Sequence, residues 1–158
     1  MRLHQLTVTA FGPFAGTERV DFDALSAGGL FLLRGATGAG KSSVLDAVCF
    51  ALYGEVPGDR HTARHLRSDQ ADAQTAARVV LRLSVAGRSF RFTRSPAWDR
   101  PKRRGHGTTR VQAHVVVEEH VSGEWVRGRR CWEQTATPGR AGSDRGGAPW
   151  PGRAGGRR

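Results

Sequence analysis

The sequence has few cysteines and no group of histidines spaced to hold a metal. Only two of its 158 residues are cysteines, Cys49 and Cys131, and neither stands at metal-ligand spacing from a histidine. The six histidines are scattered singly along the chain. This pattern argues against a disulfide framework and a structural zinc site, and it favours a reducing, cytoplasmic location.

Long apolar runs are also absent. Residues 1–14 contain no continuous apolar core, so they do not fit a signal peptide. No stretch approaches the roughly 20 apolar residues of a membrane-spanning helix, and we therefore expect no membrane partner. The formal charge is +11, and a charge of this size favours a polyanion as the binding partner.

The last fifth of the chain lacks the residues that build a core. After Val126 there is no Val, Ile, Leu, Phe, Met or Tyr, whereas eight Gly and three Pro interrupt the segment. We predict a folded domain at residues 1–126 and a disordered, Arg/Gly/Pro-rich tail at residues 127–158. Two interpretations of the tail stay open: a basic arm that binds nucleic acid, or a C-terminus read out of frame from a GC-rich gene.

Apolar periodicity predicts an α/β fold. Apolar residues recur every three or four positions over Lys41–Tyr53, which predicts a helix with one apolar face that ends at Gly54. The continuous apolar run Leu30–Arg34 is typical of a strand buried on both faces. Alternating segments predict further strands, the last three forming a β-meander. These segments are residues 3–11, 18–22, 79–85, 90–92 and 111–117.

Between the predicted buried strand and the predicted helix, the sequence reads GATGAGKSS, with the G-x-x-x-x-G-K-S pattern of a phosphate-binding loop. Glycines let backbone N–H groups approach phosphate oxygens, and the helix N-terminus adds partial positive charge. Lys41 supplies a charge for the β- and γ-phosphates, and the Ser42 hydroxyl is a hard ligand for Mg²⁺. The predicted nucleotide contacts are Gly35, Thr37, Gly38, Ala39, Gly40, Lys41, Ser42 and Ser43, with Ser42 as the Mg²⁺ ligand.

The sequence shows no catalytic residue for hydrolysis. A site of this kind commonly holds Mg²⁺ with a second carboxylate at the end of another buried strand, and it needs a group that orients water. Glu118 and Glu119 are the nearest approach, but they follow an alternating strand that lacks Asp. Whether the chain is an enzyme therefore stays open.

Several motifs together resemble the start of the SbcC family, the large subunits of the SbcCD nuclease in the SMC-like group of ABC-type ATPases. The resemblance covers residues 1 to about 126. FGPFAG after the first strand and the basic RPKRRG are the more specific motifs, since the phosphate loop alone is generic. The motifs are FGPFAG (11–16), the loop with its helix (32–58), HLRSDQA (65–71), RFTRSP (91–96), RPKRRGHGT (100–108) and GEW (123–125).

The resemblance implies a P-loop NTPase fold, as the N-terminal lobe of an ABC-type head with a mixed sheet and an antiparallel β-meander around the P-loop helix. It implies ATP and Mg²⁺ as cofactors, with an SbcD-type nuclease subunit and double-stranded DNA ends as partners. The family's coiled coil and C-terminal lobe with its signature helix have no counterpart here. We therefore expect a truncated fragment that cannot hydrolyse ATP alone. The alternative is a stand-alone basic nucleic-acid-binding module with a vestigial P-loop.

A basic cluster offers candidate DNA contacts. Its members flank a Pro- and Gly-containing loop, and the family's head binds duplex ends on its upper face. A solvated hairpin loop explains such a cluster equally simply, so both interpretations stay open. The residues are Arg94, Arg100, Lys102, Arg103 and Arg104.

Overall fold

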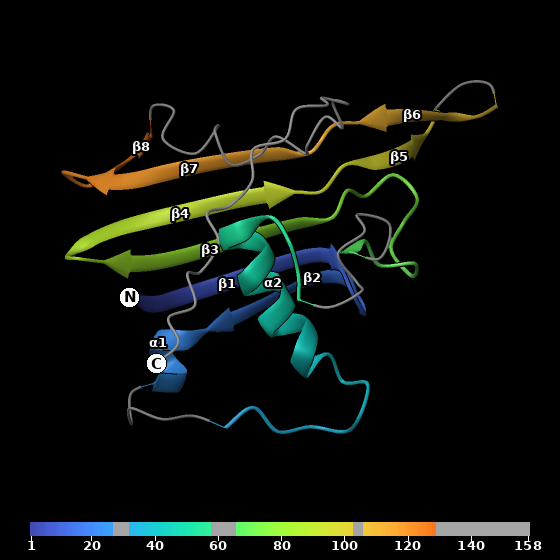
Figure 1. Ribbon diagram of the computed structural model, residues 1–158. Helices are drawn as coiled ribbons and strands as arrows, with labels where there is room; N and C mark the ends of the chain where they lie inside the picture. Colours follow the sequence, from blue (N-terminus) through green and yellow to red (C-terminus); the bar gives the residue numbers. More distant parts are fainter. Residues whose placement is uncertain (27–31, 58–65, 103–105, 129–158) are drawn as a thin grey trace, which may run out of the picture.

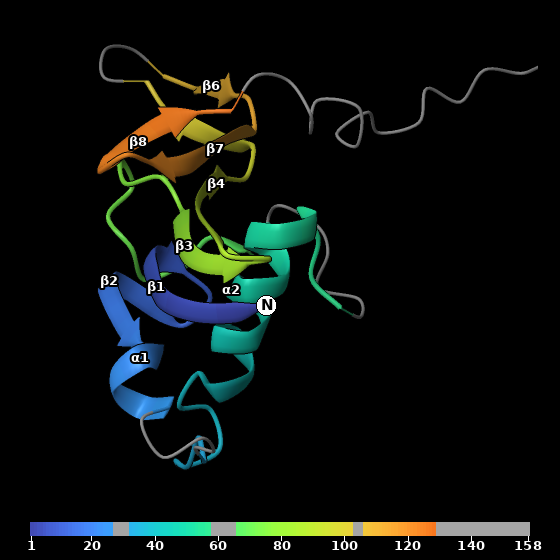
Figure 2. The same ribbon diagram turned by 90° about the vertical axis from the view of Figure 1, so that its left-hand side faces the viewer.

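The computed structural model describes residues 1–26, 32–57, 66–102 and 106–128, so nearly all of the predicted tail lies outside the described residues. One six-stranded sheet, in the order β2-β1-β3-β4-β7-β8, carries helix α2 across one face (Figures 1 and 2). The elements are β1 (Arg2–Phe11), β2 (Phe14–Asp21), α1 (Phe22–Leu25), α2 (Lys41–Tyr53), β3 (Arg78–Val85), β4 (Arg88–Ser95), β5 (Trp98–Pro101), β6 (Thr108–Val111), β7 (His114–Val121) and β8 (Glu124–Arg127).

The core lies between α2 and strands β1, β3 and β4, which the helix contacts. Leu6 and Val8 of β1 and Leu81 of β3 are at most 2% exposed, because alternate residues of each strand point to the helix side. The helix contributes Ala47 and Phe50. This confirms the predicted half-buried first strand and the apolar helix face. At 13 residues, α2 is too short to cross a bilayer, and no other described helix is long and apolar enough.

The predicted β-meander is present in β3, β4 and β7, which pair antiparallel in sequence order. The prediction of one strand over 111–117 is wrong, however. Val111 ends β6 and pairs with Trp98 of β5, whereas β7 begins at His114. A two-stranded ribbon is thus inserted between β4 and β7, and it interrupts what looked like one alternating pattern (Figure 1).

The predicted buried strand at Leu30–Arg34 is wrong where the structure describes it. Residues 32–36 are not in a strand, and Leu32 is 86% exposed; residues 30 and 31 lie outside the described residues. A strand apolar on both faces needs a neighbour at its edges and a covering layer on each side. No described strand pairs with residues 32–34, and the strands of the six-stranded sheet pair only antiparallel with one another. The expected mixed sheet is for the same reason an antiparallel one over the described residues.

Candidate phosphate-binding site

The N-terminus of α2 has no side-chain cap. The helix starts directly after Gly40, whose φ is 84°. Its first N–H groups therefore have no intrahelical acceptor, and together they carry the positive end of the helix dipole. Gly38, with a φ of 85°, turns the preceding loop in the same left-handed sense.

Lys41 lies over the loop that precedes it. Its Nζ donates hydrogen bonds to the carbonyl oxygens of Gly35 and Ala36, both at 2.7 Å. The Ser42 side chain next to it is exposed. The loop and the first turn of α2 border a groove of about 490 Å³. An ammonium group, free backbone amides and a hydroxyl thus converge on one open space, and this donor set suits a polyphosphate with a divalent cation.

Most of the predicted nucleotide contacts meet in this groove: Thr37, Gly38, Gly40, Lys41, Ser42 and Ser43 line it. Gly35 takes part through its carbonyl oxygen, and Ala39 lines a neighbouring groove instead.

Two lining residues were missed by the sequence analysis: Gly12 and Pro13, in the turn between β1 and β2. Their motif, FGPF, was used as a mark of family resemblance, and nothing in its residue types indicates a phosphate site.

The predicted basic cluster is divided in the structure. Arg94 is half-buried under the C-terminal end of α2, where its Nε donates a hydrogen bond to the Ala51 carbonyl oxygen at 3.3 Å. Burial lowers the pKa of this guanidinium. Arg100 and Lys102 are exposed on and beside the β5–β6 ribbon, whereas Arg103 and Arg104 lie outside the described residues. The ribbon therefore presents cations to solvent, while Arg94 supports the helix.

The carboxylates considered as metal ligands are engaged elsewhere. Glu118 accepts two hydrogen bonds from Arg91 at 2.7 and 2.8 Å, and Glu119 accepts two from Arg88 at 2.6 and 2.7 Å. These bonds hold the pKa values of both glutamates below their usual range. Among the described residues, no group of three His, Cys, Asp or Glu side chains could hold a metal ion.

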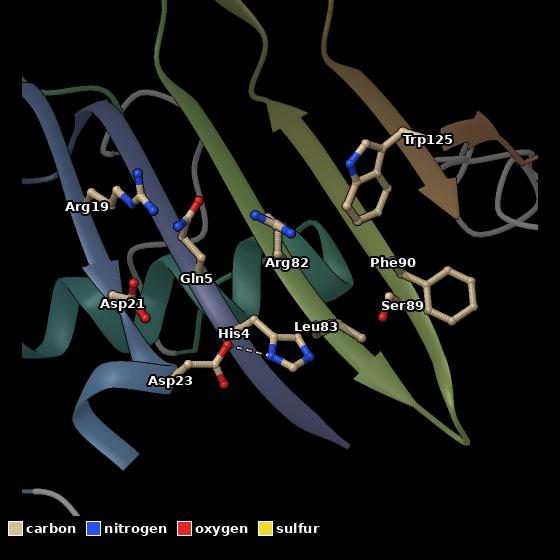
Figure 3. Close-up of a pocket in the computed structure, with 10 residues that line it drawn as sticks. All are labelled: His4, Gln5, Arg19, Asp21, Asp23, Arg82, Leu83, Ser89, Phe90 and Trp125. Carbon is tan, nitrogen blue, oxygen red and sulfur yellow. Dashed lines mark hydrogen bonds and ion pairs between the residues drawn. The ribbon is translucent and has the colours of Figure 1, made fainter. Parts of the chain in front are cut away.

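A second groove, of about 330 Å³, lies on the sheet face away from α2 (Figure 3). His4 Nδ1 lies 2.8 Å from Asp23 Oδ2, and His4 Nε2 lies 2.8 Å from Ser84 Oγ. Asp23 also pairs with Arg2. The groove mixes cations such as Arg19 and Arg82 with carboxylates, so it lacks the single sign of charge that a phosphate site requires.

Comparison with known proteins matches the AAA domain family to residues 5–129. The chain is 47% identical over 110 residues to the SbcC subunit of nuclease SbcCD from Vibrio cholerae, a match that covers 70% of this chain and 11% of that protein. The SbcC subunit from Treponema pallidum is 42% identical over 128 residues, 80% of this chain and 12% of the relative. The protein of the same name from Lactococcus lactis is 36% identical over 120 residues, 75% and 11% of the two chains. The matches thus span about a ninth of these relatives.

Proposed function

Because the chain belongs to the AAA domain family and is a relative of the SbcC subunit of nuclease SbcCD, we propose that residues 1–126 form the ATP-binding lobe of an SbcC-type ATPase. The observation that carries the proposal is the groove at the N-terminus of α2, where six of the residues of GATGAGKSS converge. Arg127 and Gly128 still belong to the sheet, where Arg127 pairs with Glu118 and Gly128 N donates to the Val117 carbonyl oxygen, so the basic tail that we propose begins after them and not at residue 127.

The residues of the groove fit a nucleotide with Mg²⁺. Backbone N–H groups at Gly38 and Gly40 and the first turn of α2 bind phosphate oxygens. The Lys41 ammonium, which donates to two loop carbonyl oxygens, would hold the β- and γ-phosphates instead when a nucleotide binds, and the charge attraction would offset the two lost hydrogen bonds. The Ser42 hydroxyl would ligate Mg²⁺, which would neutralise part of the phosphate charge.

The family relationship supports a role in processing DNA ends in the cytoplasm, with an SbcD-type nuclease subunit as partner. Double-stranded DNA is the polyanion that suits a formal charge of +11. The exposed cations Arg100 and Lys102 are the described candidates for phosphate contact. Hydrolysis needs groups beyond the cradle, and we propose that they come from another ATPase lobe and not from this chain.

Two substitutions test the site because they remove different interactions. Lys41→Ala takes a charge from the phosphates, so ATP affinity should fall by at least about tenfold with or without Mg²⁺. Ser42→Ala should leave Mg²⁺-free binding unchanged and lose most of the gain in affinity that Mg²⁺ gives. Titration calorimetry with ATP measures both. Lys102→Ala, which removes an exposed charge outside the groove, is the matched control. Equal ATP affinity in wild type and Lys41→Ala would refute the assignment.

A further inference from the structure

The turn that connects β1 to β2 forms one wall of the phosphate groove. Gly12 and Pro13 line the groove together with the loop and the first turn of α2. Gly12 has a φ of 54°, and a Cβ at this position would lie 3.2 Å from the Ser43 Oγ. The turn and the helix are therefore closely packed at Ser43, the last of the predicted phosphate contacts.

Phe14 lies against the backbone of the last loop glycine. A Cβ at Gly40 would come within 2.6 Å of Phe14 Cζ and 3.0 Å of its Cε1, and within 3.1 Å of Pro13 Cγ. Gly40 is buried and has a left-handed φ of 84°, the conformation that starts α2. The aromatic ring thus occupies the space beside Gly40 and opposes a movement of this residue away from the helix.

The turn is itself held by a third segment of the chain. Gly12 N donates to the Leu66 carbonyl oxygen at 2.9 Å, and Ser68 N donates to the Ala10 carbonyl oxygen at 2.9 Å. The neighbouring Phe11 is 1% exposed, and its ring centroid lies 5.8 Å from that of Phe50 in α2. Because the turn is held by these hydrogen bonds and by the packing of Phe11 on α2, it can restrain the phosphate loop that it contacts.

From this packing we propose that Phe14 is a positioning residue for the phosphate loop: its ring fixes Gly40, and through Gly40 the backbone amides that bind the polyphosphate. The inference rests on the proposed nucleotide site and adds a residue outside the loop to it. The inference also says which part of the ligand the Phe14 ring affects. Phe14 acts on the phosphate part of the ligand and does not stack on a base.

The choice of ligand separates these roles. Binding of ATP and of inorganic tripolyphosphate, which has no base, is measured for the wild-type chain and for Phe14→Ala. We expect Phe14→Ala to weaken both ligands by the same factor, about tenfold. Phe14→Leu keeps an apolar side chain against Gly40 and should recover part of the affinity. A loss restricted to ATP would show stacking on the base and overturn the proposal, as would unchanged binding of both ligands.

A second aromatic residue controls for general destabilisation. Phe90 of β4 also packs against the core but belongs to a strand away from the loop. Phe90→Ala should lower the melting temperature and leave the affinity for tripolyphosphate near that of the wild type. An equal loss of tripolyphosphate affinity in Phe90→Ala and Phe14→Ala would mean that Phe14 acts only as a core residue, and it would overturn the proposal. Wild-type chain that binds neither ligand would overturn the nucleotide site itself, whereas wild-type binding with an unaffected Phe14→Ala would overturn only the role of Phe14.

Discussion

At the scale of single residues, Arg94 shows how a cation that looks like a DNA contact can serve the fold. Its guanidinium lies over the Phe50 ring, 5.9 Å from the centroid, and bonds to a carbonyl near the end of α2. Gly54, directly after the helix, has a φ of 84° and lies so close to Arg94 that a Cβ there would meet the guanidinium. The helix end and the arginine are thus fitted to each other.

Arg94 and Arg100 should therefore respond differently to substitution. Arg94→Ala should destabilise the chain by about 1–2 kcal/mol, since a hydrogen bond and a cation–π contact are both lost. Arg100→Ala removes an exposed charge and should leave stability unchanged while weakening duplex binding and reducing its salt dependence. Thermal unfolding and DNA binding at several salt concentrations measure the two effects. Full stability in Arg94→Ala would contradict the structural role.

At the scale of elements, ion pairs join β4 and β7, and they should make the free energy of unfolding depend on pH. Bonds from Arg91 hold the pKa of Glu118 below its unfolded value, and those from Arg88 do the same for Glu119. Such groups stabilise the fold above the unfolded pKa of about 4.3, and they lose this contribution as the pH falls through the folded pKa. Asp23, whose pKa is lowered by His4 and Arg2, acts in the same direction.

Glu118→Gln should therefore cost up to about 1 kcal/mol at pH 7, and this cost should shrink as the pH falls through the folded pKa and the wild-type carboxyl becomes protonated. Denaturant unfolding between pH 7 and pH 2.5 gives the two profiles. Glu124→Gln removes one negative charge from the exposed start of β8 and controls for net charge. Coincident profiles for wild type and Glu118→Gln would mean that the pair adds nothing to stability, and profiles with a constant offset would mean that its contribution does not depend on ionisation of Glu118.

The periodicity of apolar residues predicted those helices and strands whose packing partners are present among the described residues. The apolar face of Lys41–Tyr53 and the left-handed Gly54 mark α2 and its end, and β1 and β3 alternate because one face is covered by that helix. The strand predicted at Leu30–Arg34 failed because a doubly buried strand depends on neighbours that periodicity cannot supply. The roles of Pro13 and Phe14 were hidden for a related reason: the turn meets the loop only in the folded chain, 20 or more residues away in sequence.

At the scale of the whole molecule, we expect the backbone amides of the folded domain to be protected from hydrogen exchange and those of the predicted tail to be unprotected. The folded domain is bonded in one sheet through β8, which ends at Arg127, while the tail is predicted to lack a core. Amides of β1 and β3 should exchange slowly with solvent, and amides beyond Arg140 should exchange at nearly the unfolded rate. Hydrogen exchange read by mass spectrometry resolves the two regions. Slow exchange beyond Arg140 would show that the tail is structured.

The whole chain should bind nucleotide without hydrolysing it. Phosphoryl transfer depends on positioned water and on charge stabilisation from several groups at once, and each missing group costs orders of magnitude in rate. The described residues supply the proposed phosphate cradle with Lys41 and Ser42. Glu118 and Glu119 are bonded to arginines, and the described residues contain no group of three His, Cys, Asp or Glu side chains that could hold a metal ion. Phosphate release by the wild-type chain with ATP and Mg²⁺ should therefore equal that of Lys41→Ala prepared in parallel.

Turnover in the wild type that Lys41→Ala abolishes would show that this lobe contains a complete catalytic site. Turnover that appears only when a separate ATPase lobe is added would instead show that the cradle is one part of a shared site.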